Sequence, residues 1–349
     1  MPDDAADHAY RYLIDFIDGN RGEEIVRELQ RTDGSGRRPF DVSVASLDAD
    51  LSFLTKRATL VTAKLVLSQP GGEHCYLAHR EICKRCGADP DHCGPGCRYE
   101  DIRIDQLFAE CDDLDRLGAY LRDCAPLLEL GQLVYFPQTF RRSHLESRAP
   151  DAESTSSPFN SVGQIELGDN PDRTLDLIVK GHRVVDVPSG DPVKARLVTP
   201  LLQLDLPMLE GTSLRDYCAI LTQEGDALAA TQAYLRGRML EVDTDPDKAL
   251  VQLAKLDAEI QEGVRAARAE VGRVSRRSAV QAAGAAVATV AATLVAVEGT
   301  HLAPVLGMLG AGGFFSAVLA ADQYADRRGE LRQRPFYLLW LLSRRSVPA

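Results

Sequence analysis

The sequence lacks the short motifs that identify the common enzyme classes. No phosphate-binding P-loop, glycine-rich dinucleotide turn, nucleophile elbow or protein-kinase signature occurs in its 349 residues, and there is no internal repeat. Its one glycine-rich stretch, 310–313, lies within an apolar segment and follows no predicted strand. These absences therefore argue against an enzyme, although they do not exclude one.

The chain also lacks an excess of positive charge. It has 51 acidic and 40 basic residues and a net charge of −11. Residues 270–349 carry a net charge of +4, so residues 1–269 carry −15. Because nucleic-acid binding depends on Lys and Arg side chains that neutralise phosphates, the acidic body argues against a nucleic-acid partner. Arg is far commoner than Lys, which is typical of GC-rich genomes and favours a bacterial source.

No secretory signal is visible, because the start Met1-Pro2-Asp3-Asp4 is acidic and no uncharged run follows it. We therefore expect the body of the protein in the cytoplasm. In that reducing compartment, the eight cysteines are expected to be buried thiols or metal ligands and not disulfides.

Cysteine and histidine are concentrated between residues 74 and 97. The segment Cys83-Lys84-Arg85-Cys86-Gly87 has the two-residue spacing and the following glycine of a zinc knuckle, and Cys93-Gly94-Pro95-Gly96-Cys97 supplies a second pair. Four thiolates complete a tetrahedral structural Zn²⁺ site. The predicted ligands are Cys83, Cys86, Cys93 and Cys97, with His74, Cys75, His79 and His92 as alternates.

Two other interpretations of this cluster stay open. It is a cysteine-rich loop without metal, or it is the centre of a soluble metal-dependent enzyme. A catalytic metal is disfavoured because no paired His and Glu motif of a metalloprotease or deaminase is present. The remaining cysteines, Cys111, Cys124 and Cys218, fall on apolar faces and are predicted to be core residues.

Two uncharged segments occur near the C-terminus, at 278–297 and 302–321. As helices they would each span roughly 30 Å, which matches the hydrocarbon thickness of a bilayer. Arginines precede the first segment and follow the second, which predicts a transmembrane hairpin at 278–321 in the inner (cytoplasmic) membrane with both termini in the cytoplasm. The lipid bilayer is then a partner.

The apolar hairpin has two alternatives because its hydrophobicity is modest. It is buried in a soluble, cytoplasmic helical bundle, or it inserts conditionally as in pore-forming effectors. The aromatic segment 335–342 is expected either to lie at the membrane interface or to dock on the body as a terminal helix.

Hydrophobic periodicity predicts a helix-rich α+β fold. Helices are expected over 7–17, 23–29, 104–128 and 213–241 and from Pro246 onwards, and strands over 59–67, 133–136, 162–167, 175–187 and 195–206. Asp176, Lys180 and Asp186 are expected on solvated strand faces. The expected parts are an α/β N-terminal region at 1–148 with the Cys/His-rich insertion at 70–98, a linker at 149–160, strands followed by an α-helical pair at 161–277, the hairpin at 278–321, and a basic, aromatic tail at 322–349.

Together these features predict a membrane-associated bacterial protein with a cytoplasmic body and a structural zinc loop. It acts as an interaction scaffold, a sensor or a membrane-acting effector. Protein partners are expected to bind through the helices at 213–275, where apolar residues recur every seven positions.

Overall fold

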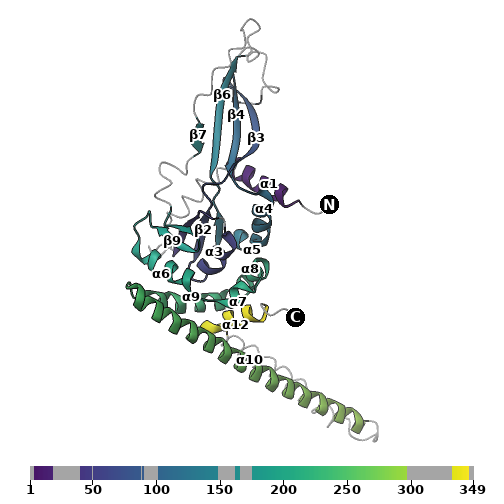
Figure 1. Ribbon diagram of the computed structural model, residues 1–349. Helices are drawn as coiled ribbons and strands as arrows, with labels where there is room; N and C mark the ends of the chain where they lie inside the picture. Colours follow the sequence, from purple (N-terminus) through teal and green to yellow (C-terminus); the bar gives the residue numbers. More distant parts are fainter. Residues whose placement is uncertain are drawn as a thin grey trace, which may run out of the picture. The chain divides into compact units, whose positions relative to one another are not determined.

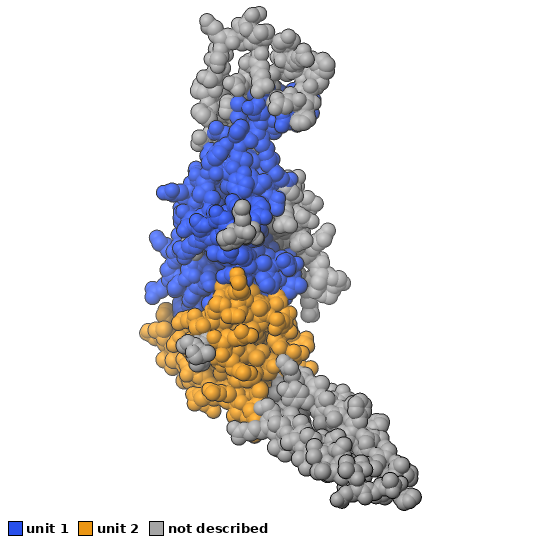
Figure 2. Space-filling model, turned by 90° about the vertical axis from the view of Figure 1, so that its right-hand side faces the viewer, with its two compact units in different colours: residues 1–203 blue, residues 204–349 orange. Residues whose placement is uncertain are grey.

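The computed structural model of the chain describes residues 4–18, 40–48, 50–87, 89, 101–147, 162–165, 175–296 and 332–345. For residues 101, 141–147, 162–165 and 274–296 it describes the backbone only. The chain forms two compact units, residues 1–203 (unit 1) and residues 204–349 (unit 2), which are coloured separately in Figure 2. The predicted helix at 23–29 and the predicted linker at 149–160 lie outside the described residues.

Unit 1 contains a mostly parallel sheet, sheet A, with the strand order β5-β2-β1-β8-β9. The first four strands are parallel, and β9 is antiparallel to β8. Almost every residue of β1 and β2 is buried, so both faces of the sheet are covered, which is usual for parallel strands. The bounds are β1 Asp41–Ser46, β2 Lys64–Ser68, β5 Leu133–Tyr135, β8 Leu177–Lys180 and β9 Arg183–Asp186.

Helices connect and cover these strands. They are α1 Ala5–Asp18, α3 Leu51–Ala58, α4 Leu114–Asp123, α5 Ala125–Glu129 and α6 Pro192–Gln203. Carboxylates begin two of them: Asp50 accepts a hydrogen bond from the Phe53 amide (3.0 Å) and Asp113 from the Arg116 amide (3.0 Å). The helix predicted at 7–17 is confirmed as α1, whose Phe16 ring meets Phe136 edge-on at 4.8 Å.

A second sheet of unit 1, sheet B, is antiparallel and has the order β3-β4-β6-β7. Its bounds are β3 His74–Cys83, β4 Asp101–Glu110, β6 Thr139–Ser147 and β7 Val162–Ile165. In Figure 1 the three long strands β3, β4 and β6 run side by side, with the short β7 beside β6. The pairing of β3 with β4 is regular except for a bulge between Tyr76 and Ala78.

Two secondary-structure predictions were wrong. The first half of the helix predicted at 104–128 is strand β4, because pairing with β3 and β6 outweighs a helical spacing of apolar residues. The strand predicted at 195–206 is helix α6, whose buried Leu197, Val198, Leu201 and Leu202 have helical spacing. The strand predicted at 59–67 begins only at Lys64. The strand at 133–136 is confirmed as β5, and the segment 175–187 forms the hairpin of β8 and β9.

Unit 2 is helical in its described residues. Its helices are α7 Pro207–Glu210, α8 Leu214–Gln223, α9 Gly225–Leu240, α10 Pro246–Ala296 and α12 Pro335–Arg345. The predicted start at Ser213 is confirmed, since the Ser213 hydroxyl accepts a hydrogen bond from the Asp216 amide (3.1 Å). The predicted helix at 213–241 is, however, divided at Glu224 into α8 and α9.

The C-terminal aromatic segment docks within unit 2. Helix α12 contacts α7, α8, α9 and α10, and its Leu338, Leu339 and Leu342 are fully buried while Trp340 is 5% exposed. The Thr231 hydroxyl donates to the Pro335 carbonyl (2.7 Å). Of the two alternatives for this segment, the structure therefore shows the docked terminal helix.

Among the residues that the structure describes, no helix combines the length and the apolar character needed to cross a membrane. The first uncharged segment enters α10, whose helical backbone is described as far as Ala296. The second segment, 302–321, lies outside the described residues. The α+β fold is thus confirmed, whereas a transmembrane hairpin finds no support in the described part of the chain.

Candidate functional site

The predicted zinc-knuckle turn lies at the end of β3. The strand ends at Cys83, which is 2% exposed, and residues 84–86 form a turn. The Gly87 amide donates to the Cys83 carbonyl (2.8 Å), and Gly87 has φ = 73°. A left-handed glycine of this kind closes a tight turn, which is the backbone shape that lets two cysteines of a knuckle face one ion.

The rest of the predicted ligand set is not described. His92, Cys93 and Cys97 lie outside the described residues. Within the ranges that are described, no three or more His, Cys, Asp or Glu side chains are grouped so that they could hold a metal ion. The metal site therefore stays a prediction of which the structure describes only the first pair.

Sheet geometry separates the alternate ligands from this turn. Cys75 and Cys83 lie on one extended strand, eight residues apart, which is about 27 Å at the rise of a β-strand. His74 is one residue further away, and His79 lies about 13 Å from Cys83 along the same strand. These three residues therefore cannot share one ion with Cys83.

Cys75 has a different environment at the start of β3. Its thiol donates to the Cys111 carbonyl (2.9 Å). Burial raises the pKa of Cys75 above its ordinary value and raises the pKa of Cys111 to about 11. Both thiols are therefore protonated at neutral pH, which makes them poor nucleophiles. Cys111, Cys124 and Cys218 are at most 4% exposed, which confirms that they are core residues.

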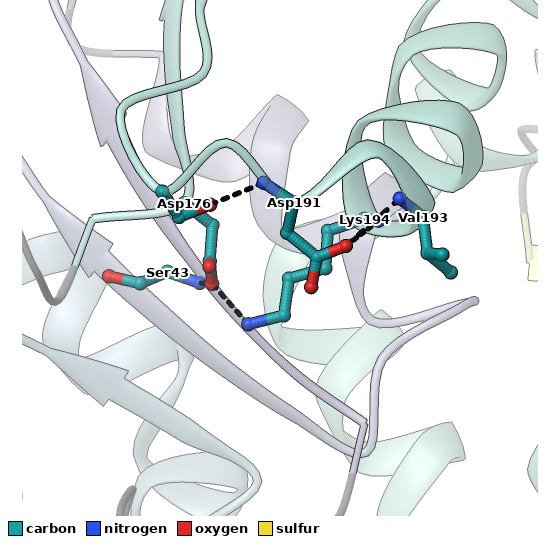
Figure 3. A network of polar contacts seen from close by, with 6 residues as sticks. Ser43, Asp176, Asp191, Val193 and Lys194 are labelled. Carbon is teal, nitrogen blue, oxygen red and sulfur yellow. Dashed lines mark hydrogen bonds and ion pairs between the residues drawn. The ribbon is translucent and has the colours of Figure 1, made fainter.

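A buried carboxylate missed by sequence reasoning lies at the amino end of β8 (Figure 3). Asp176, expected on a solvated face, is only 8% exposed. One of its oxygens accepts hydrogen bonds from the Ser43 amide (2.8 Å) and from Lys194 Nζ (2.7 Å). Asp191 accepts from the Val193 amide (2.9 Å) and so begins α6, which places Lys194 beside Asp176. Lys180 and Asp186 are exposed, as expected.

The opposite, carboxyl end of sheet A is where open α/β sheets usually bind ligands. The connections leave the neighbouring strands β1 and β8 in opposite directions, which makes this the switch point of the sheet. Asp48 accepts a hydrogen bond from the Gly181 amide, and Asp50 lies 3.1 Å from His182 Nε2. The His182 ring stacks on Phe53 at 3.8 Å.

These contacts give the switch-point residues a structural role. Gly181 and His182 both have positive φ, so they form the tight two-residue turn between β8 and β9. The carboxylates and the Phe53 ring fasten that turn to the beginning of α3. The sequence predicts a strand pair here, and Gly181, between the apolar residues at 177–179 and 184–185, is the signal for its turn.

Comparisons with protein-family models, with characterised proteins and with solved structures give no match to this chain, so its function must be argued from its own residues.

Proposed function

We propose that the protein acts through interactions and not through catalysis, from a position at the inner membrane to which the segment 278–321 attaches it, with both termini in the cytoplasm. The observation that carries this proposal is the way unit 2 holds the two ends of that segment together. The uncharged, arginine-flanked sequence suits a bilayer. The contacts between α10 and α12 in unit 2 hold the two ends of the segment close together.

Helix α12 returns to α10 at a defined place. Arg334 Nη1 lies 2.5 Å from Glu270 Oε2, and Arg332 Nε lies 2.7 Å from Glu224. At Gly263 a Cβ atom would come within 2.5 Å of the Phe336 ring, so only glycine permits this close packing. Residues 271–333 therefore begin and end at one site on unit 2.

This closure fits a hairpin tether. A chain that leaves and returns at one place crosses a bilayer an even number of times, which keeps both of its ends on the same side. Both uncharged segments fall between Glu270 and Arg334, and arginines occur at each end of the interval. Arginine at both ends is the pattern of a hairpin whose flanks stay in the cytoplasm.

The tether is tested by fractionation of the full chain under an alkaline carbonate wash. We expect the protein in the membrane fraction. A Val290→Lys variant, with a charge near the middle of the first segment, should move to the soluble fraction because a central Lys costs about 2.5–3.5 kcal/mol. The control Ala279→Lys, beside the arginine flank, should stay in the membrane fraction. Complete release of the intact, unsubstituted chain would contradict the tether.

A deletion distinguishes loss of the tether from loss of the fold. Because Glu270 and Arg334 meet, a short Gly/Ser linker can replace residues 275–330 without separating α10 from α12. We expect this variant to be released by the wash and to keep the thermal unfolding midpoint of the full chain. A deletion variant that stays in the membrane fraction would place the attachment elsewhere.

We further propose that the loop following β3 is a structural Zn²⁺ site with the ligands Cys83, Cys86, Cys93 and Cys97. The support is the turn at Cys83, in which Gly87 closes the geometry of a knuckle. Zinc in such a site stabilises a loop that has little apolar sequence of its own. The role proposed for the metal is structural.

Metal analysis of the untagged full chain tests the ligand set. We expect zinc in the purified protein and its loss in Cys83→Ser and Cys97→Ser, with the matched control Cys75→Ser, about 27 Å away along β3, keeping its zinc. Zinc retained by both ligand variants would show that the assignment is wrong. If zinc were lost and an activity disappeared while the fold stayed intact, the site would be catalytic.

A further inference from the structure

Exposed arginines gather on α10 shortly before the first uncharged segment. They are Arg265, Arg268 and Arg273, whose side chains are all exposed, and we call them the arginine face. Because an α-helix has 3.6 residues per turn, Arg265 and Arg268 lie on the side of α10 opposite Gly263, where Phe336 packs. The arginine face therefore takes no part in the core of unit 2.

The acidic residues near the arginine face leave much of its positive charge uncompensated. Glu270 lies 2.5 Å from the arginine that precedes α12. Glu262 lies 3.0 Å from Arg265, but these two side chains are 70% and 69% exposed, and an ion pair in water contributes little. Among the residues that the structure describes, neither Arg268 nor Arg273 has an ion-pair partner. The arginine face therefore has an excess of positive charge that fits an anionic partner.

The place of the arginine face along α10 indicates which anion it meets. The same helix continues into the uncharged segment 278–297, for which we propose attachment to the bilayer. At 1.5 Å per residue, Arg273 lies about 8 Å and Arg268 about 15 Å from the start of that segment. Because lipid headgroups occupy roughly the first 5–8 Å outside the hydrocarbon, both arginines come within about one Debye length of them. A nucleic acid fits less well, since residues 1–269 carry a net charge of −15.

We propose that the arginine face binds the headgroups of anionic phospholipids, such as phosphatidylglycerol, in the membrane to which 278–321 attaches the protein. This inference rests on the membrane attachment proposed above and adds a lipid class to it. It also explains how a segment of modest hydrophobicity stays attached, because each basic residue near an anionic surface strengthens binding about fivefold. Attachment is then expected to depend on the charge of the lipid and to weaken at high salt.

Vesicle flotation of the purified full chain tests the lipid class. One set of vesicles is phosphatidylcholine alone, and the other is a mixture of phosphatidylcholine and phosphatidylglycerol. We expect tighter binding to the mixed vesicles, and binding about thirtyfold weaker in Arg268→Gln/Arg273→Gln, the effect of two arginines. The matched control Arg116→Gln/Arg183→Gln removes two exposed arginines of unit 1 and should bind as the unsubstituted chain does. On phosphatidylcholine alone the two double variants should bind alike.

Other outcomes would contradict the proposal, and they differ in what they leave standing. If the chain binds both kinds of vesicle equally well, or if Arg268→Gln/Arg273→Gln binds mixed vesicles as tightly as its control does, the lipid class is wrong and the attachment of 278–321 still stands. If the chain floats with neither kind of vesicle, the attachment itself is wrong. If the full chain binds fluorescein-labelled duplex DNA and Arg268→Gln/Arg273→Gln does not, the arginine face belongs to a nucleic-acid site and the lipid proposal is overturned.

Discussion

Sheets A and B of unit 1 differ in what their strands leave exposed. In sheet A, parallel strands such as β1 and β2 are buried on both faces, and after the first residue of each they consist of Val, Leu, Ser and Ala. In sheet B, antiparallel β3 has only two buried residues, Leu77 and Cys83, and its His74 and Tyr76 rings are exposed to solvent. The physical reason is connectivity, because crossover helices cover parallel strands whereas antiparallel strands need no such cover. The free energy of unfolding is therefore expected to depend more on side chains of sheet A than on those of sheet B.

The largest expected effect on the free energy of unfolding comes from the removal of a core side chain in sheet A. Leu67 of β2 is fully buried, so Leu67→Ala should lower the free energy of unfolding by about 3 kcal/mol. Tyr76→Ala in sheet B should change it by less than about 0.5 kcal/mol, since the side chain is largely exposed. Urea unfolding of both variants measures the difference. If both variants lost the same free energy of unfolding, the two sheets would not differ in this way.

A smaller effect is expected at the amino end of sheet A. Asp176→Ala leaves the Ser43 amide and Lys194 without their buried acceptor and should lower the free energy of unfolding by about 2 kcal/mol. The control Asp186→Ala removes an exposed carboxylate of β9 and should be nearly neutral. Urea unfolding that gave Asp176→Ala the stability of this control would show that the network of Figure 3 contributes nothing.

In sheet B, the turn after β3 should respond locally. Gly87 has φ = 73°, where an L side chain is strained, although a Cβ atom there would have nothing within 4 Å. Gly87→Ala should therefore destabilise the turn by about 1 kcal/mol through backbone strain alone. We expect faster amide exchange at residues 83–87 and unchanged exchange in β1 and β2. Faster exchange in both sheets would show that they unfold as one unit.

The smallest effect concerns the pH dependence of sheet A. Burial raises the pKa of Asp41 at the start of β1, and Lys64 and Lys194 oppose this only in part. The native state then holds the proton more tightly than the unfolded state does. The contribution of Asp41 to the free energy of unfolding therefore falls as pH rises through the ordinary pKa of aspartate and the raised native one.

Asp41→Asn removes this titration. The stability of the variant relative to the unsubstituted chain should increase between about pH 3 and pH 7, measured by urea unfolding at several pH values. Lys64→Gln is an informative second variant, since loss of a nearby positive charge should enlarge the pH dependence. A stability difference for Asp41→Asn that does not change with pH would show that the carboxyl group has the same pKa in both states.

Predictions from the local sequence were correct where a single residue determines a helix start or a tight turn. Ser213 was predicted to begin a helix, and its hydroxyl caps α8. Pro246 was predicted at the start of the next helix and begins α10. The Cys83 to Gly87 spacing predicted a tight turn, which the Gly87 amide closes. Such signals are reliable because the hydrogen bonds concerned join residues close in sequence.

Predictions failed where partners distant in sequence decide the conformation. Ile104 and Leu107 fit a helical spacing, yet β4 pairs with β3 and with β6, and these contacts determine its backbone. Asp176 was expected on a solvated face because nothing nearby in the sequence places Ser43 beside it, 133 residues away. The ring contacts of His74 with Phe140 and of Tyr76 with Phe108 were missed for the same reason, since each joins two separate strands of sheet B.

By itself, the sequence determined the α+β class, the starts of α8 and α10, the division between an acidic body and a basic tail, and the segregation of cysteine and histidine into one stretch. Composition and short-range hydrogen bonds are properties of neighbouring residues, so they can be read along the chain. Tertiary structure alone decided that His74 and Cys75 lie far from Cys83, that α12 returns to Glu270, and that rings of β3 lie against rings of β4 and β6. Each of these depends on strand register or helix packing, which the chain specifies only through contacts between distant residues.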